Sequence, residues 1–167
     1  MHFNQIVGTI CEVNQINNMH VFDIIIETPK GHNEKFNFDP GSGGFKLKKM
    51  LPAGMVFPCD FGFIPHTKGE DGDPLDALVF SEIKSFPGCI MECRLIGAFI
   101  CEQQEKQKMI RNDRYLFVPT ESKQFAAIKK IKDLDNKMMD EIKSFFRQYN
   151  ELEGKEFKVI KEVVKTC

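Results

Sequence analysis

The sequence predicts an α+β fold that is mainly β: a closed barrel of short strands with one long amphipathic helix packed against it. Through the first two thirds of the 167 residues, β-branched and aromatic segments alternate with turns that contain glycine and proline. This spacing is typical of a barrel. The hydrophobic period then lengthens to that of a helix. The length, with no repeat, low-complexity tract or linker, fits one domain over residues 1–167.

Strand signals recur along the chain. Residues 19–29 are rich in β-branched side chains and stop at Pro29. In residues 34–39 the side chains alternate, so that Phe36 and Phe38 share one face. The predicted strands are MHVFDIIIETP (19–29), EKFNFD (34–39), GFKLKKML (44–51), DALVF (76–80), CIMECRLIGAFIC (89–101), RYLFVP (114–119) and EFKVIKEVV (156–164).

One amphipathic helix of four to five turns is predicted over residues 135–154. Asp135 or Asn136 can cap its start, and Gly154 follows its end. We expect its apolar side chains at helical spacing to pack on the barrel. These are Met138, Ile142, Phe145, Tyr149 and Leu152.

Charge and hydropathy exclude several classes of protein. The 23 basic and 24 acidic residues nearly cancel, whereas a nucleic-acid-binding protein usually carries a basic excess. No apolar segment reaches the ~18 residues of a membrane span, and the N-terminus does not resemble a signal peptide. The six cysteines form no CxxC pair, which favours buried thiols over a zinc or disulfide site. We therefore expect a cytoplasmic protein that binds neither nucleic acid nor membrane.

An acidic cluster opens the segment GEDGDPLDALVF (69–80) and allows three interpretations. Glu70, Asp71, Asp73 and Asp76 lie within seven positions, where like charges repel by about 4 kcal/mol per pair at 4 Å. The segment could be an acidic turn, because Asp, Gly and Pro all favour turns. A calcium-binding EF-hand loop is rejected, since Asp76 falls where that loop needs glycine and predicted strands flank it. The third interpretation is a site for divalent metal and phosphate.

The third interpretation agrees with the chemistry of carboxylates. Their oxygens suit magnesium, which keeps several waters and bridges to phosphate. Two such ions would activate a water and neutralise charge on a phosphoryl group. The phosphate oxygens would also need cations or donors from neighbouring elements. Candidates are Lys35, Lys46, Lys48, Lys49, Arg114 and Tyr149.

The segment MVFPCDFGFIPHTKGEDGDPLDALVF (55–80) resembles the central part of the family I soluble inorganic pyrophosphatases. The shared signature is D-G-D-P-x-D, preceded by a Pro-Cys stretch with aromatics and by His-Thr. IIIETP, EKFNFD and IKSFFRQYNELEGKEFKV resemble other parts of the family in the same order. The resemblance implies a five-stranded, OB-like barrel that hydrolyses pyrophosphate with magnesium, or with manganese in its place. Bacterial members tend to be hexamers, so we expect a homo-oligomer of unassigned size.

The resemblance also implies roles for matching residues. Asp71 and Asp76 would bind the first metal ion, and Asp76 would be shared with a second. Asp73 would accept a proton from the attacking water. Glu27 would lie close to the metal, while Lys35, Lys49, Arg114 and Tyr149 would contact the phosphates of the substrate.

Several positions depart from the family pattern, and a further acidic position of the family falls near Glu102 and Gln103, where the loop is longer. An expected metal carboxylate is the amide Asn112, unless its neighbour Asp113 takes that place. The other substitutions are Asn37 for an acidic residue, Lys49 for arginine, Phe61 for tyrosine and Asn150 for lysine. An amide is a weaker partner than a carboxylate for a hard cation, and lysine gives up the two-pronged contact of arginine with phosphate. Two functions therefore stay open: a magnesium-dependent pyrophosphatase, or a degenerate relative that binds metal or a phosphorylated ligand with little turnover.

Overall fold

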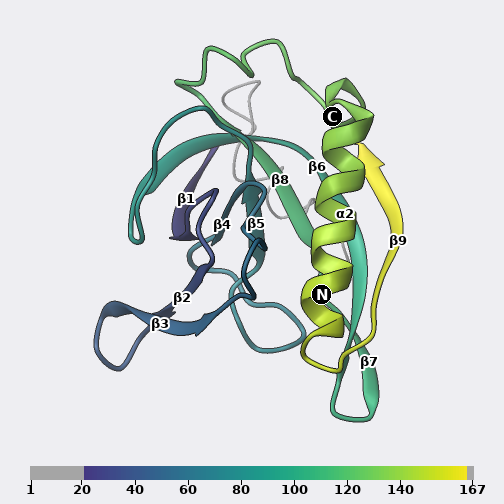
Figure 1. Ribbon diagram of the computed structural model, residues 1–167. Helices are drawn as coiled ribbons and strands as arrows, with labels where there is room; N and C mark the ends of the chain where they lie inside the picture. The colour runs from purple at the N-terminus through teal and green to yellow at the C-terminus, as the bar shows by residue number, and fades with distance from the viewer. Residues whose placement is uncertain (1–20, 165–167) are drawn as a thin grey trace.

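The computed structural model describes residues 21–164, and its centre is a closed ring of strands (Figure 1). The ring runs β1–β4–β5–β8–β6 and closes where β6 returns to β1. The predicted fold, a mainly β protein with a five-stranded OB-like barrel and one long helix, is confirmed. The ring strands are β1 (Val21–Thr28), β4 (Asp60–Phe63), β5 (Asp76–Val79), β6 (Ile90–Glu105) and β8 (Arg114–Pro119).

The ring closes because β1 pairs with two neighbours. Its first half, from Val21 to Ile25, is antiparallel to β6, and its second half is antiparallel to β4. The half that pairs with β4 contains a register shift between Ile26 and Thr28. β5 and β8 pair in parallel, with Asp76 beside Arg114 in the register. That pairing brings the end of the acidic loop against a basic side chain.

Three of the predicted strands, β2 (Glu34–Asp39), β3 (Gly44–Met50) and β9 (Phe157–Val164), lie outside the ring. β2 and β3 pair only with each other and form a hairpin that extends from the barrel in Figure 1. The long strand β6 also pairs with β7 (Lys108–Arg111) and β9. The strand signal missed β4 (DFGF) and β7 (KMIR), because glycine and charged residues interrupt their apolar pattern.

The helix α2 (Asn136–Glu151) begins where the sequence predicted. The Asp135 carboxylate caps it by accepting a hydrogen bond of 2.7 Å from the Lys137 N–H. The predicted apolar face is partly wrong: Leu152 lies past the end of the helix and is 58% exposed. The side chains that α2 buries are Met139, Ile142, Phe145, Phe146 and Asn150. A short 3-10 helix, η1 (Ile131–Asp133), precedes α2.

Strands β5 and β8 are buried on both faces. In β8, Phe117 packs with Ile24 and Val79 in one cluster, which fills the ring. Leu116 points the other way and packs with Ile142 in a second cluster, which lies between the ring and α2. Side chains of a strand alternate between its faces, so two hydrophobic layers require an almost continuous apolar segment.

Cysteine and membrane predictions can be compared with the described residues. Cys59, Cys93 and Cys101 are buried free thiols, and Cys89 is a half-buried one. Burial raises the pKa of all four thiols. Cys11 and Cys167 lie outside the described residues, as do positions 19 and 20 of the first predicted strand. Across residues 21–164, no helix has the length and apolar character needed to span a membrane.

Gly62 is required where β4 approaches β1. A methyl group there would overlap the carbonyl oxygen of Ile25 and press on the backbone of Ile26. We expect Gly62→Ala to lower the free energy of unfolding by about 1–3 kcal/mol. Gly44→Ala is the control, because its nearest neighbour would be the Ser42 hydroxyl at 3.8 Å. In denaturant titrations, the free energy of unfolding of the control should lie within about 0.5 kcal/mol of the wild-type value. Equal stability of the two variants would contradict the prediction.

Candidate active site

The acidic loop, residues 64–75, connects β4 to β5 and is closed by its own hydrogen bonds. The Ile64 N–H donates to the Leu75 carbonyl at 2.9 Å, and the Leu75 N–H donates to the Thr67 hydroxyl at 2.9 Å. At the tip, the Asp71 carboxylate accepts from the Asp73 N–H at 3.1 Å. This turn leaves the Asp71 and Asp73 side chains exposed, while Asp76 begins β5 and is half-buried.

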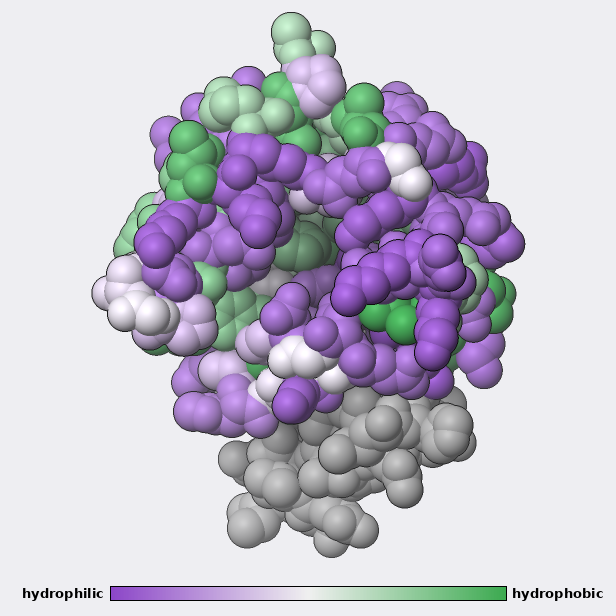
Figure 2. Space-filling view, turned by 90° about the horizontal axis from the view of Figure 1, so that it is seen from below, coloured by the Kyte–Doolittle hydropathy of each residue, from purple (hydrophilic) through white to green (hydrophobic). Residues whose placement is uncertain are grey.

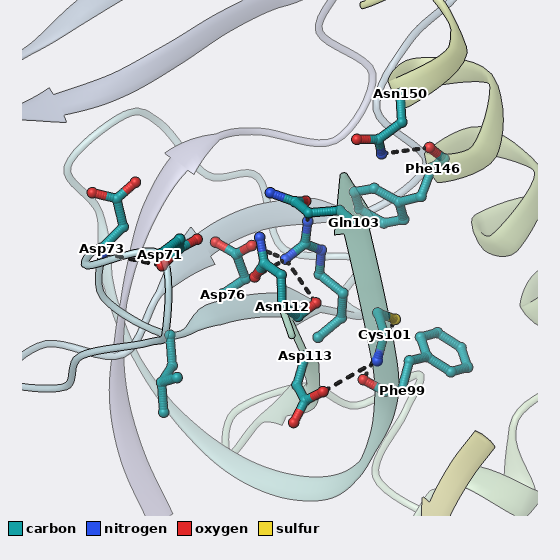
Figure 3. A network of polar contacts seen from close by, with 12 residues as sticks. Asp71, Asp73, Asp76, Phe99, Cys101, Gln103, Asn112, Asp113, Phe146 and Asn150 are labelled. Carbon is teal, nitrogen blue, oxygen red and sulfur yellow. Dashed lines mark hydrogen bonds and ion pairs between the residues drawn. The ribbon is translucent and has the colours of Figure 1, made fainter. Parts of the chain in front are cut away.

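Asp76 is held by Arg114, its neighbour across the parallel strands. Arg114 Nη1 pairs with the Asp76 carboxylate and donates to Asn112 Oδ1 at 2.6 Å. Arg114 Nη2 lies 3.4 Å from Gln103 Oε1 on β6. Figure 3 shows Asp76, Asn112 and Gln103 converging, with Asp71 and Asp73 beside them on the loop. Burial raises the pKa of Asp76, and the Arg114 charge opposes that shift.

A second ion pair, between Glu27 and Lys35, lies beside the first. Lys35 Nζ is 3.8 Å from Glu27 Oε2, and Glu27 Oε1 accepts from the Phe38 N–H at 2.7 Å. Lys35 Nζ also lies 3.9 Å from the centre of the Phe61 ring, a cation–π contact. Burial lowers the pKa of Lys35 to about 8 against the opposing effect of Glu27, and it raises the pKa of Glu27.

The third basic side chain of the site, Lys49, lies on the β2–β3 hairpin. Lys49 Nζ lies 3.9 Å from the centre of the Tyr149 ring and forms an ion pair with Glu153. Burial raises the pKa of the Tyr149 hydroxyl, an effect that Lys49 opposes. Lys49 and Tyr149 thus form a pair between β3 and the end of α2.

The structure brings most of the predicted site residues together. Charges on Glu27, Asp73, Asp76 and Arg114 all act on the pKa values of groups in the two ion pairs. The end of α2, the acidic loop and the β2–β3 hairpin all lie toward the lower side of Figure 1. Figure 2 shows the molecule from that side, with a mostly hydrophilic surface that is hollowed near its centre. Two candidate lysines stay apart: Lys46 pairs with Asp39 on the hairpin, and Lys48 is exposed.

The substituted positions have defined places. Asp113 does not take the place of Asn112, because it points away toward the Cys101 N–H, at 3.1 Å, and forms an ion pair with Arg111 (Figure 3). Asn150 donates to the Phe146 carbonyl within α2 at 2.8 Å, so its amide is used in the helix. The Phe61 ring lies against Lys35, and without a hydroxyl it offers no hydrogen bond there. Sequence reasoning left Gln103 unassigned because it lies past the predicted strand of residues 89–101, whereas the structure buries it on β6.

The donor set determines whether a metal ion fits. Within residues 21–164, no three Asp, Glu, His or Cys side chains are gathered in a group that could hold an ion. The chemistry is nevertheless that of a hard dication site: Asp71, Asp73 and Asp76 offer only oxygen. Burial, followed by the negative charges of Asp76 and Asp73, raises the pKa of Asp71. An added cation would relieve that repulsion, so the donor chemistry suits a hard dication although the three side chains are not gathered in this structure.

Comparison with known proteins gives the family. A family model described as inorganic pyrophosphatase matches residues 24–166. An inorganic pyrophosphatase of Halalkalibacterium halodurans is 38% identical over 141 residues, which cover 83% of this chain and 83% of that protein. Another, from Thermus thermophilus, is 36% identical over 141 residues, covering 84% and 78% respectively.

Solved structures agree. The inorganic pyrophosphatase from Thermus thermophilus has a TM-score of 0.80 and 35% identity, with 86% of this chain and 82% of that one covered. The enzyme from Helicobacter pylori has a TM-score of 0.79 and 31% identity, covering 87% and 85%. Barrel and site together define a protein that presents clustered carboxylates to buried cations. The chain belongs to the inorganic pyrophosphatase family, as the resemblance predicted.

Asp60, the first residue of β4, holds in place a segment that carries two of the site residues. Its buried carboxylate accepts from the Lys30 N–H at 2.7 Å and from the Ser85 hydroxyl at 2.9 Å. Lys30 lies on the connection between Glu27 and Lys35, so Asp60 restrains the segment that carries both.

We expect Asp60→Ala to lower the free energy of unfolding by about 1–3 kcal/mol, because it leaves two donors unpaired. Asp60→Asn keeps an acceptor oxygen of similar shape and should cost less. Denaturant unfolding of both variants tests this order; an alanine variant as stable as the asparagine variant would contradict it.

Proposed function

We propose that this protein hydrolyses inorganic pyrophosphate to two orthophosphates with magnesium, or with manganese in its place. The observation that carries the proposal is the placement of the carboxylates of Glu27 and Asp76, next to the acidic loop, beside the buried cations Lys35 and Arg114. Dications on the first set and phosphate oxygens on the second would produce the charge alternation that phosphoryl transfer needs. Membership of the inorganic pyrophosphatase family supports the same reaction.

The residues to which the family resemblance gives roles keep those roles in this proposal. Asp71 and Asp76 would hold the metal, with Glu27 and the Asn112 amide oxygen nearby. When bound, the metal supplies a water of lowered pKa and neutralises charge on the phosphates. Lys35, Lys49, Arg114 and Tyr149 would bind the phosphate oxygens.

Asp73 would accept the proton of the attacking water. The water oxygen bonds to one phosphorus, the bond from that phosphorus to the bridging oxygen breaks, and the second phosphate leaves with that oxygen. Asp73 suits this role because its side chain is exposed on the loop tip and only its backbone is restrained there. Lys35, with a pKa of about 8, still carries its proton at neutral pH and can offset charge on the leaving phosphate.

The degenerate alternative has observations of its own. Asn112 offers an amide where the family places a carboxylate, and Asn150 is bonded inside the helix rather than offered to substrate. If two such changes each cost about 3 kcal/mol of transition-state stabilisation, the rate falls on the order of ten-thousand-fold. The losses need not add, because the groups share one site.

We further propose that the protein acts in the cytoplasm as a homo-oligomer, with pyrophosphate as its small-molecule partner. The buried, unpaired thiols of Cys59, Cys93 and Cys101 support a reducing compartment. The tendency of bacterial members of the family to form hexamers supports the assembly.

Asp73→Asn provides the direct test of catalysis. With magnesium and pyrophosphate, the wild type should release phosphate, and the variant should be slower by about a hundredfold or more, since it loses the proton acceptor. Asp140→Asn, a change at an exposed aspartate of α2, is the matched control and should keep wild-type activity. Equal background rates in the wild type and Asp73→Asn would reject turnover and leave the binding alternative.

Metal dependence is tested by chelation. Phosphate release should fall to background with excess EDTA and return when magnesium or manganese is added. Calorimetric titration with magnesium alone should show binding to the wild type and weaker binding to Asp76→Asn, which removes a charged ligand. Undiminished activity in the chelator would contradict the metal role.

A further inference from the structure

Arg114 is fixed within the site. Its residue is 5% exposed, and Nη1 makes both the ion pair with Asp76 and the 2.6 Å bond to Asn112 Oδ1. Nη1 also lies 3.3 Å from the Asn112 carbonyl, and Nη2 lies 3.4 Å from Gln103 Oε1. The orientation of the guanidinium is therefore set by oxygens on β5, on β6 and on the residues just before β8.

Aromatic rings enclose the same group. The guanidinium carbon of Arg114 lies 5.4 Å from the centre of the Phe146 ring and 6.0 Å from those of Phe61 and Phe157. The three rings come from α2, β4 and β9, so these aromatic contacts form only when segments distant in the sequence pack together. Apolar walls exclude water and strengthen the attraction between the guanidinium and its partner carboxylate.

The side-chain oxygens of Asn112 and Gln103 near Arg114 are neutral, so the positive charge of the guanidinium has to be balanced by a carboxylate. Asn112 and Gln103 are amides, so they orient the guanidinium without competing for its charge. Asp113, the nearest acidic residue in sequence, faces Arg111 instead. Among the described ion pairs, Asp76 is the carboxylate that pairs with Arg114. Arg114 Nη1 contacts Oδ2 of Asp76, so a metal ion on that oxygen would displace the contact, and one on the other oxygen would still meet the repulsion of the guanidinium charge.

We propose that Arg114 is an internal counter-ion that competes with the divalent cation for Asp76. In the metal-free protein the guanidinium neutralises the carboxylate and keeps β5 and β8 paired without buried charge repulsion. Cation binding would exchange one positive partner of Asp76 for another and leave Nη1 with its contacts to Asn112. The affinity for metal is lowered by the exchange. This inference rests on the metal role proposed for Asp76.

Calorimetric titration of the full chain with magnesium alone tests the competition. Arg114→Gln removes the competing charge but keeps a polar side chain, and we expect its affinity for magnesium to rise about ten- to a hundredfold, the range of a charge-assisted hydrogen bond. Lys49→Gln is the matched control, because Lys49 is a cation of the same site that pairs with Glu153 and not with Asp76. Its affinity should change by less than about threefold, the size of a modest long-range charge effect.

The outcomes separate this inference from the proposed function. If Arg114→Gln binds magnesium no more tightly than Lys49→Gln, the competition is overturned, although the wild type can still hydrolyse pyrophosphate. If none of the proteins binds magnesium, both the competition and the metal role are overturned. Failure of hydrolysis together with tighter binding by Arg114→Gln would reject the function and support the competition.

A measurement on the wild type covers the case in which Arg114→Gln does not fold. Nitrogen-15 NMR of the arginine side chains reports whether the Nη groups are held or rotate, and Arg114→Lys assigns the Arg114 signal by its absence. We expect the Arg114 Nη signals to be resolved without metal and to broaden as magnesium binds, because the contact with Asp76 is released. Unchanged signals at saturating magnesium would overturn the inference.

Discussion

The ion pair between Asp76 and Arg114 is the interaction on which the site depends. It lies where β5 and β8 run in parallel, and the register places the two residues side by side. Removing one partner would leave a charge unmatched in a largely apolar setting, at a cost of several kcal/mol. The acidic loop leads directly into Asp76 at the start of β5, so this contact links the loop to the buried Arg114.

The hydrophobic core and the site share side chains. Phe61 lies beneath Lys35, and it also packs against Phe146 of α2 with ring centres 6.1 Å apart. Phe146 and Phe157 in turn face Arg114. The rings that fasten the helix to the barrel therefore also set the dielectric environment of the cations. A change in helix packing would move the charges, because close-packed interiors transmit small displacements.

The carboxylates of the acidic loop are exposed, whereas the cations Lys35 and Arg114 are buried. Asp71 and Asp73 lie in water at the loop tip, where a hydrated dication can reach them, whereas Lys35 and Arg114 are held by packing and ion pairs. Preorganised cations cost little to reorient when an anion arrives. The amides Asn112 and Gln103 place neutral oxygens around Arg114 and add no negative charge to balance it.

The sequence by itself determined the mainly β barrel, the capped helix and the acidic loop, because turn residues, hydrophobic periods and Asp spacing are local properties. It also led to the family through the signature around Asp71 and Asp73. Only the tertiary structure decided that Asp113 faces Arg111 and that Leu152 lies past the helix on the surface. It alone brought Gln103 to Arg114. These placements depend on strand register and on which rings pack together, and contacts between distant segments leave no periodic trace in the chain.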